Sequence, residues 1–366
     1  MTKEAKHKTI AFYIGSLARG GAEHVMVNLA AYFKSQGYKV YLVTKLIDEP
    51  EYEVPEGVDR IVADITKEEE CDSRISNLRN RIKKLKNIWK EIKPDIIVSF
   101  IRKNNLMAIA SSRGLNIPVV VSIRSNPARE LEGRFFKPLS FFMFRFASGI
   151  IMQTTAGVEF LPGYLKKKAV VMPNSIDGSF IGEGFEKGRK NEIVLVGRID
   201  KNKNQKMVLK VFDKIKDEYP DWSLHLYGDG ESKEELQNKY RDDRIVFHGQ
   251  VSGVKDYIKD SSIFVLPSKQ EGMPNALIEA MALGLACIST DCPCGGPADL
   301  IKHDENGILI PVDDEKELEK QLVRLMNDAN LRELLGKEAT KISKILSPDI
   351  VNAKWKEYIE SKIAGL

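Results

Sequence analysis

Residues 262–284 read SIFVLPSKQEGMPNALIEAMALG. The run from 262 to 266 is apolar after its first residue and ends at a Pro-Ser pair, which is typical of a strand buried on both faces. A polar loop follows, and Pro274 suits the first turn of a helix that ends at Gly284, since glycine commonly follows a helix C-terminus. A strand, a short loop and a helix in this order form the repeating unit of a parallel α/β sheet.

The same alternation extends along the chain of 366 residues. It predicts strands at residues 9–14, 40–44, 95–100, 118–123 and 149–152, and again at 192–196, 223–227, 244–248, 262–266, 286–290 and 307–310. Helical spacing fills the gaps, for example at residues 22–35 and 74–92. A chain of this length usually needs two hydrophobic cores. The predicted fold class is therefore α/β, with two doubly wound Rossmann-like domains.

A polar, glycine-rich stretch at residues 173–192 separates the two sets of strands and indicates a linker. We predict an N-terminal domain at residues 1–180 and a C-terminal domain at 181–347. Residues 348–366 carry apolar side chains at helical spacing and are predicted to form a helix that packs back toward the N-terminal domain. In doubly wound sheets ligands bind beyond the carboxyl ends of the strands, so we expect the site in the cleft between two such domains.

Composition excludes several classes of protein. A net charge of only +4 gives no reason to expect nucleic-acid binding. The cysteines lack the paired spacing of a zinc or redox site and are expected to be free thiols; they are Cys71, Cys287, Cys292 and Cys294. The apolar run near the N-terminus is too short for a signal peptide, and no run reaches the roughly 20 residues of a membrane-spanning helix. We expect a cytoplasmic protein.

A glycine-rich loop follows the first predicted strand, with Gly15, Gly20 and Gly21 ahead of a helix. Such a loop exposes backbone N–H groups that suit an anion. The spacing fits neither GxGxxG nor the P-loop, in which a lysine would replace Gly21. A plain tight turn explains the loop equally well.

Two cations, Arg198 and Lys203, follow the first strand of the second predicted domain. A guanidinium and an ammonium at that edge can clamp a diphosphate. Solvated surface charge is the alternative. The position beside a glycine at the carboxyl end of a strand favours the clamp.

Two carboxylates lie in the opening stretch. Glu271 faces the helix N-terminus, where the backbone N–H groups of Gly272 and Met273 are available. Glu279 lies among Ala and Leu inside the helix, where an unpaired carboxylate would be costly. A salt bridge or a cap to a neighbouring loop would satisfy it, and so would the hydroxyl groups of a ligand. Cations for phosphates and carboxylates for hydroxyls together indicate a nucleotide sugar.

The spacing from Glu271 to Glu279 resembles the E-x7-E signature of the GT4 family of retaining glycosyltransferases, which have the GT-B fold. Further similar motifs occur in the family's order along essentially the whole chain. They are Gly20-Gly21-Ala22-Glu23, Pro173-Asn174-Ser-Ile-Asp177, Val196-Gly-Arg198 with Lys203, Gly228-Asp-Gly230 and Phe247-His-Gly249.

The resemblance implies a role for each matching position. Arg198 and Lys203 would bind the donor diphosphate and steady the leaving group, and Glu271 would hold the donor sugar; these three are the expected catalytic residues. Glu279 would bind the ribose diol, and Val251 would lie by the base. The other expected donor-binding residues are Gly20, Gly21, Gly272, Met273, Pro274 and Asn275. The family needs no metal, and the pairs at residues 242–243 and 313–314, like Asp48, look like loop residues rather than a metal-binding DxD motif.

One departure concerns the end of the strand predicted at residues 118–123. The family often has a histidine there, near the reacting carbon, whereas this chain has Arg124. An arginine cannot act as a general base at neutral pH. Family members are thought to retain configuration by front-face attack, in which the leaving phosphate takes the acceptor proton, and that mechanism tolerates the change. Arg124 and Asn126 are expected on the acceptor side.

Two segments of the first predicted domain suggest a membrane surface. Residues 74–93 carry eight Lys or Arg, one Glu and an apolar stripe at helical spacing. Such a helix can lie on an anionic membrane, although an ordinary domain helix has the same pattern. Residues 134–147 contain six Phe with only basic charges, more than a core helix usually needs. We expect peripheral contact with the inner face of the cell membrane and a lipid-linked acceptor.

The residues and the resemblance together thus predict a retaining, metal-independent glycosyltransferase that moves a hexose or N-acetylhexosamine from a UDP-sugar to a lipid-linked saccharide acceptor in surface glycan biosynthesis. No cofactor and no nucleic acid are expected. Two alternatives stay open: an isomerase like UDP-N-acetylglucosamine 2-epimerase, which shares the fold, and a non-catalytic partner subunit of a glycosyltransferase. The intact set of Arg198, Lys203, Glu271 and Glu279 argues against the second.

Overall fold

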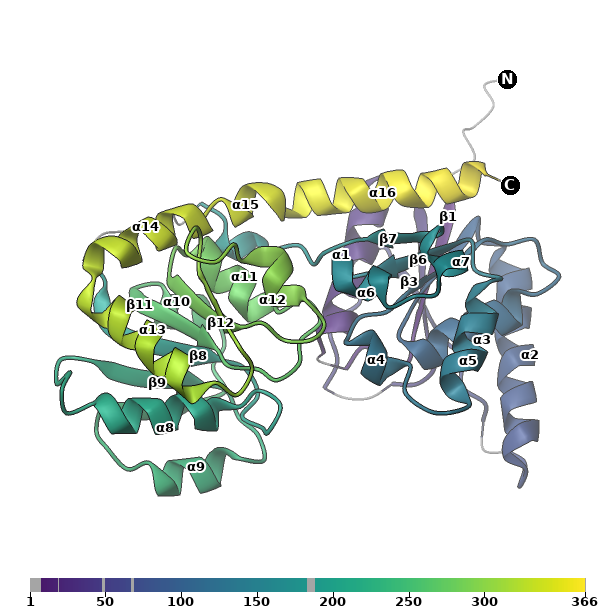
Figure 1. Ribbon diagram of the computed structural model, residues 1–366. Coiled ribbons are helices and arrows are strands. Elements are labelled where there is room, and N and C mark those ends of the chain that lie inside the picture. Colours follow the sequence, from purple (N-terminus) through teal and green to yellow (C-terminus); the bar gives the residue numbers. More distant parts are fainter. Residues whose placement is uncertain (1–7, 19, 48–49, 67–68, 183–187, 366) are drawn as a thin grey trace. The chain divides into compact units, whose positions relative to one another are not determined.

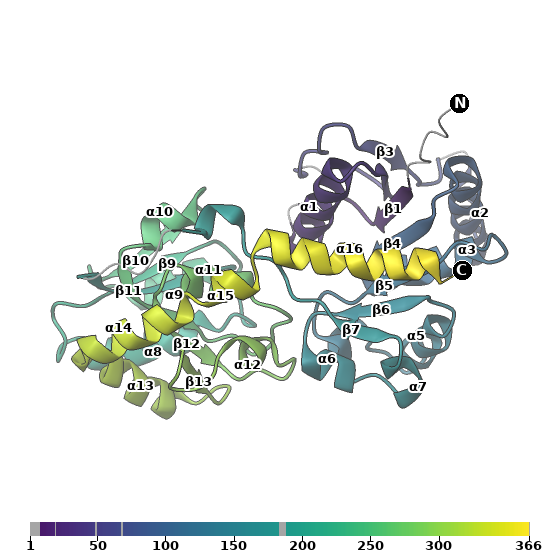
Figure 2. The same ribbon diagram turned by 90° about the horizontal axis from the view of Figure 1, so that it is seen from above.

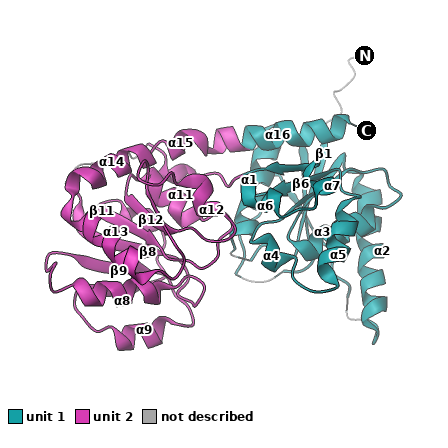
Figure 3. Cartoon of the chain, in the orientation of Figure 1, with its two compact units in different colours: residues 1–172, 352–366 teal, residues 173–351 magenta. Residues whose placement is uncertain are grey.

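The computed structural model describes residues 8–18, 20–47, 50–66, 69–182 and 188–365. The chain forms two compact units, shown in different colours in Figure 3. Unit 1 comprises residues 1–172 with 352–366, and unit 2 comprises residues 173–351. The boundary therefore follows residue 172, whereas the sequence placed it after residue 180.

Unit 1 (Figure 1) is built on a parallel sheet with the strand order β3-β2-β1-β4-β5-β6-β7, which can be followed in Figure 2. Its strands are β1 (Thr9–Ile14), β2 (Lys39–Thr44), β3 (Asp59–Val62), β4 (Ile96–Phe100), β5 (Val119–Ser122), β6 (Gly149–Met152) and β7 (Ala169–Val171). Its helices are α1 (Gly21–Ser35), α2 (Arg74–Ile92), α3 (Arg102–Ser112), α4 (Pro127–Glu130), α5 (Phe136–Phe144), α6 (Thr155–Glu159) and α7 (Gly163–Lys166).

The last helix, α16 (Pro348–Ala364), contributes its residues from Asn352 onward to unit 1, where Figure 2 shows it crossing the strands. Trp355 is fully buried, and its ring centroid lies 5.8 Å from that of Phe100. The helix approaches β6 closely, since a Cβ on Gly149 at the start of β6 would lie 2.2 Å from the Tyr358 hydroxyl. The helix thus completes the apolar cover of the sheet.

Unit 2 has a six-stranded parallel sheet with the order β10-β9-β8-β11-β12-β13. Its strands are β8 (Lys190–Val196), β9 (Ser223–Tyr227), β10 (Ile245–Gly249), β11 (Ser261–Leu266), β12 (Ala286–Thr290) and β13 (Ile308–Ile310). Its helices are η2 (Gly178–Phe180, a 3-10 helix), α8 (Gln205–Ile215), α9 (Lys233–Lys239), α10 (Val254–Ile258), α11 (Asn275–Ala282), α12 (Gly296–Leu300), α13 (Glu315–Asn327), α14 (Ala329–Ala339) and α15 (Ile342–Ile345).

The predicted fold class of two doubly wound parallel α/β domains is confirmed. Strands such as β4, β5 and β11 are buried along their whole length, because helices cover both faces of the sheets. The prediction missed β3 and β7, which are short strands at the two edges of the first sheet. Their side chains stay partly exposed, so their apolar signal is weak.

The stretch predicted as a linker, residues 173–192, is only partly one. Ile176 donates its N–H to the Leu346 carbonyl at 2.8 Å, so the start of the stretch packs into unit 2. Lys190 already belongs to β8. Residues 183–187 lie outside the described residues, as does Asp48. Polar composition predicted a loop correctly here but could not show that the loop is anchored.

Candidate active site

The candidate site lies at the carboxyl ends of β8 and β11, which are paired in the middle of the second sheet. The chain continues from β8 toward β9 on one side and from β11 toward β12 on the other. The loops at residues 197–204 and 267–274 thus leave the sheet at the point where its strand order reverses, which is where doubly wound sheets bind ligands.

The loop after β8 is held rigidly. One carboxylate oxygen of Asp200 accepts the N–H groups of Asn202 at 2.9 Å and Lys203 at 2.8 Å. Gly228, with φ at +145°, lies so close to Gly197 that a Cβ would be 2.0 Å from the Gly197 carbonyl oxygen. Only glycine allows this approach and this backbone conformation. The position of the Lys203 backbone is thus fixed by its own loop and by the neighbouring one.

The two loops are also joined to each other. Lys269 donates its N–H to the Asn202 carbonyl at 2.8 Å, and the Asn202 amide donates to the Gln270 carbonyl at 3.0 Å. The Lys203 Nζ lies 2.6 Å from the Glu271 Oε1, and both side chains are largely shielded from water. The predicted phosphate-binding cation and the predicted sugar-binding carboxylate therefore form one charge-assisted pair.

The backbone between Glu271 and α11 is fixed from two further directions. The buried Asn174 side chain donates to the Asn275 Oδ1 at 2.6 Å and to the Met273 carbonyl at 3.3 Å. On the other side, a Cβ on Gly296 would lie 1.7 Å from the Gly272 carbonyl oxygen, so α12 must begin with glycine. Sequence reasoning gave neither Asn174 nor Gly296 a role, because both act only across long separations in the chain.

Helix α11 begins one residue later than predicted, with Pro274 as its N-cap. It ends as expected, because Gly284 follows the last turn with φ at +75°. Glu279 in its interior has a carboxyl group that is largely buried. Burial, with a smaller contribution from the nearby Asp177 carboxylate, raises the pKa of that group to about 7.

No described residue forms a hydrogen bond or an ion pair with the Glu279 carboxylate. The salt bridge considered as its alternative explanation is therefore absent from the described part of the chain. The nearby charge is instead the like charge of Asp177. The site thus contains one carboxylate that is paired with Lys203 and one that is left to titrate near neutral pH.

A pocket of about 370 Å³ lies beside these loops at the carboxyl ends of β8, β9 and β10. Arg198 and Val251 both line it, together with Tyr227. The Arg198 side chain is 77% exposed, and its Nε lies 3.8 Å from the Asp200 carboxylate. Two residues predicted to meet the diphosphate and the base therefore border one pocket of a size that small ligands use.

The remaining predicted residues belong to unit 1. Gly20 is the N-cap of α1 and Gly21 its first residue, so the glycine loop does end at a helix N-terminus. Arg124 is buried, with its guanidinium 4.9 Å from the centroid of the Phe100 ring, and burial lowers its pKa to about 10. It stays charged at neutral pH. Asn126 caps α4 by accepting the Ala128 N–H at 2.9 Å.

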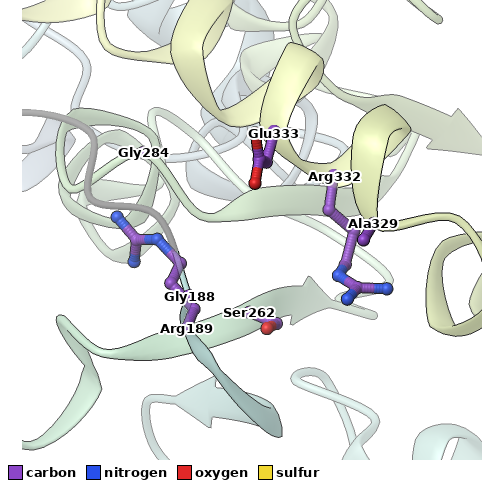
Figure 4. A pocket seen from close by; sticks show the side chains of 7 residues that line it. All are labelled: Gly188, Arg189, Ser262, Gly284, Ala329, Arg332 and Glu333. Atoms are coloured by element: carbon purple, nitrogen blue, oxygen red, sulfur yellow. The ribbon is translucent and has the colours of Figure 1, made fainter.

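A second pocket of unit 2, about 100 Å³ in volume, lies at the opposite edge of the sheet (Figure 4). Arg189 precedes β8, and Gly284 precedes β12, so this pocket is at the amino ends of the strands. The Arg189 guanidinium donates to the carbonyl oxygens of Ser261 and Leu283. Arg189 thus joins the start of β11 to the end of α11 and is not part of the candidate site.

Comparison with known proteins identifies the family. Residues 19–180 match the family described as Glycosyltransferase Family 4, and residues 190–328 match Glycosyl transferases group 1. The chain is a GT4-like glycosyltransferase with the GT-B fold. The matched ranges contain the predicted Arg198, Lys203, Glu271 and Glu279 in the second and the glycine loop in the first.

Individual relatives agree with this assignment. A GalNAc-alpha-(1->4)-GalNAc-alpha-(1->3)-diNAcBac-PP-undecaprenol alpha-1,4-N-acetyl-D-galactosaminyltransferase from Campylobacter jejuni is 28% identical over 360 residues, which cover 96% of this chain and 98% of that protein. A lipopolysaccharide 1,6-galactosyltransferase from Escherichia coli is 34% identical over 167 residues, 43% of each chain. HepE from Anabaena, solved in complex with UDP and glucose, has the same fold, with a TM-score of 0.79 at 16% identity over 97% of this chain and 100% of that one.

Two observations bear on metals and membranes. In the ranges that the structure describes, no group of three or more His, Cys, Asp or Glu side chains could hold a metal ion. The metal independence of this glycosyltransferase remains a prediction. None of the described helices combines the length and the apolar character needed to cross a membrane.

Proposed function

We propose that this glycosyltransferase moves a hexose or N-acetylhexosamine from a UDP-sugar to a lipid-linked saccharide, with retention of configuration and without a metal. The observation that supports this most directly is the contact between Lys203 and Glu271 at the switch point of the second sheet. It puts a group for phosphate and a group for sugar hydroxyls side by side, which is the combination that a nucleotide sugar requires at its reacting bond.

Each residue then has a role in the donor complex. Lys203 divides its contacts between Glu271 and the donor diphosphate. The exposed Arg198, which lines the neighbouring pocket, binds the same diphosphate. Glu271 holds the sugar hydroxyls, and the backbone of residues 272–275 surrounds the sugar and the phosphates. Glu279 accepts the two ribose hydroxyls, and Val251 lies by the base. The leaving phosphate takes the acceptor proton, so no protein base is needed.

The acceptor side is assigned to unit 1. The N-terminus of α1 at Gly20 and Gly21 offers backbone N–H groups to phosphate or acceptor. Arg124 is buried against Phe100. It therefore supplies positive charge to the acceptor side of unit 1 without contacting the acceptor directly. Asn126 holds the loop in place as a cap.

The choice of substrates is supported by the relatives. HepE was solved with UDP, with UDP-glucose and with UDP and glucose. Two relatives from Campylobacter jejuni carry names that describe transfer to a diphospho-undecaprenol saccharide. Others are lipopolysaccharide galactosyltransferases. A UDP-sugar donor and a lipid-linked acceptor in bacterial glycan assembly fit this set.

An apolar surface on α5 supports contact with a membrane. The side chains of Phe135, Phe136 and Phe142 are 80%, 53% and 52% exposed. Arginines lie against rings of the same segment: the Arg102 guanidinium is 5.0 Å from the Phe136 ring centroid, and that of Arg113 is 4.1 Å from the Phe146 centroid. We call Phe135, Phe136, Leu139, Phe142 and Phe146 the α5 patch. Exposed aromatic rings among basic groups suit an anionic bilayer surface, where rings enter the headgroup layer and cations meet the lipid phosphates.

Helix α2 contributes differently from what its sequence suggested. Its later turns are buried through Leu85 and Trp89, whereas Ile75 near its start is 71% exposed. Two of its lysines are engaged within unit 1, because Lys84 donates to the Asp64 carbonyl and Lys86 to the Arg113 carbonyl. Only its first turns are therefore assigned to the membrane surface, and the rest is an ordinary domain helix.

A panel of nucleotide sugars tests the proposal, with binding followed by calorimetry and products by mass spectrometry and NMR. We expect a UDP-sugar to bind and its sugar to appear on a saccharide-diphosphate acceptor with the donor's anomeric configuration. Conversion of the donor sugar without an acceptor would support the epimerase alternative. Binding of the nucleotide sugar without any turnover in the presence of acceptor would support a non-catalytic subunit.

A further inference from the structure

A cavity of about 430 Å³ lies within unit 1, bounded by α2, α3 and α5. Helix α3 packs against both of the others, and Figure 1 shows the three together. We propose that this groove holds the part of the acceptor's polyprenyl chain that is nearest to the phosphate. The inference rests on the proposed function, because it supplies a binding site for the lipid of the lipid-linked acceptor.

The body of the groove is apolar. Its walls are formed by side chains that recur at helical spacing and include Leu78 and Ile82 of α2, Met107 and Ala110 of α3, and Leu139 and Met143 of α5. Methionine side chains are flexible and adapt to irregular shapes. Surfaces of this kind normally pack against another element, but here they enclose space large enough for a ligand.

One end of the groove is basic. Lys45 follows β2 and Lys103 lies in the first turn of α3, and both line the cavity. No ion pair joins either lysine to a carboxylate in the part of unit 1 that the structure describes. The third cation, Arg81, is engaged with Asp64 at 3.2 Å. A cavity with an apolar body and two uncompensated ammonium groups at one end is complementary to an amphiphile with an anionic head.

The position of that basic end favours the acceptor over a bulk phospholipid. Tyr13 and Lys45 mark the carboxyl ends of β1 and β2, the edge at which doubly wound sheets bind their substrates. The groove also reaches Phe136 and Leu139, which are exposed members of the α5 patch, and the Phe136 ring lies 5.0 Å from the Arg102 guanidinium beside Lys103. A chain anchored by its phosphate at the sheet edge would thus leave the groove where the protein is proposed to meet lipid.

The test uses soluble acceptor analogues in the absence of vesicles and below their micelle concentration. The same saccharide diphosphate is prepared with a methyl group and with a ten-carbon prenyl group. Burial of one methylene is worth about a fourfold gain in affinity. We therefore expect the prenyl analogue to have a KM at least about tenfold lower than the methyl analogue, with kcat within about twofold.

Two variants with matched bulk show whether the groove is responsible. Ala110→Trp fills it, and we expect the KM ratio of the two analogues to fall to about one to two, since the tail loses its site. Ala31→Trp adds the same side chain on an exposed position of α1, outside the groove, and should keep the full ratio. If Ala110→Trp does not fold, Leu139→Gln serves instead, because it makes the wall polar at nearly constant volume. Lys45→Ala should raise KM for both analogues by the same factor.

The outcomes separate the inference from the proposed function. Transfer to both analogues with equal KM would overturn the groove assignment and leave the glycosyltransferase proposal standing. A short-chain phospholipid that competes with the prenyl tail as well as a prenyl diphosphate does would identify a general lipid site and also overturn it. A lack of transfer to every diphosphate acceptor would overturn the proposed function and the inference with it.

Discussion

Replacing Glu279 by glutamine should make the folded glycosyltransferase more stable near pH 8, although it removes the carboxylate proposed to bind the ribose. The reason is the burial of this carboxyl group without a described partner, which raises its pKa to about 7. An unfolded chain ionises a glutamate near pH 4.3. Between these two values the folded protein holds a proton that the unfolded chain releases, so stability is lost as the pH rises.

The size of the effect follows from the difference in pKa. A separation of roughly 2.5 pKa units corresponds to about 3 kcal/mol when both states are fully ionised. The penalty is less than about 1 kcal/mol at pH 5 and approaches about 3 kcal/mol at pH 8. Glutamine has no charge to desolvate and removes this pH-dependent term. For a unit of this size, about 3 kcal/mol corresponds to a Tm increase of roughly 6–12 °C.

Thermal unfolding of the wild type and of Glu279→Gln, measured from pH 5 to pH 8, provides the assay. The two curves should nearly coincide at pH 5 and separate steadily above it, with the variant the more stable. Glu235→Gln is the control, since Glu235 is exposed on α9, and it should shift stability by less than about 1 kcal/mol with no trend in this range. Parallel pH profiles for the wild type and Glu279→Gln would refute the reasoning, because they would mean that Glu279 ionises alike in the folded and unfolded states.

Four further predictions concern the donor site and the membrane surface. Affinity for UDP should rise as the pH increases from about 6 to 8, because ribose hydroxyls bind best to the ionised Glu279; calorimetry should lose this trend in Glu279→Gln. Lys203→Ala should weaken UDP and UDP-sugar alike by at least about tenfold, since a charge-assisted contact is lost, and unchanged UDP affinity would remove its diphosphate role. Glu271→Gln should lower turnover far more than UDP binding, as steady-state kinetics beside calorimetry can show. Phe142→Ser should reduce flotation with anionic vesicles severalfold, whereas turnover of a soluble acceptor should stay as in the wild type; undiminished flotation would exclude that ring from the membrane surface.

Much of the architecture could be predicted from the sequence, because parallel strands covered on both faces leave a strong signal. The run at residues 263–266 is apolar at every position, and the structure buries the whole of β11. Gly284 predicted the end of α11 correctly for a stereochemical reason. The residues after β8 and β11 could be grouped because parallel strands deliver their carboxyl ends to one edge.

The supports of the site could not be predicted in this way. Asn174 and Asn275 are joined by a hydrogen bond but are 101 positions apart, and nothing in either local sequence indicates the other. Gly296 looks like an ordinary helix start, and only the proximity of the Gly272 carbonyl shows why it must lack a side chain. The stripe on α2 gave a single amphipathic pattern, although the fold buries one half of it and exposes the other. Such divisions depend on which elements become neighbours.

The two glutamates of the opening stretch solve one electrostatic problem in different ways. A donor diphosphate is an anion, and two free carboxylates beside it would repel it. In the structure the Glu271 charge is balanced by Lys203 at 2.6 Å. The Glu279 charge is suppressed by burial, which keeps a fraction of the group protonated at neutral pH. The site can therefore accept an anion without first expelling either carboxylate. When the hydroxyl groups of a ligand bind, Glu271 can exchange its contact with Lys203, and Glu279 its proton, for hydrogen bonds to the ligand. Both carboxylates therefore favour a ligand that carries phosphate and hydroxyl groups together over one that carries phosphate alone.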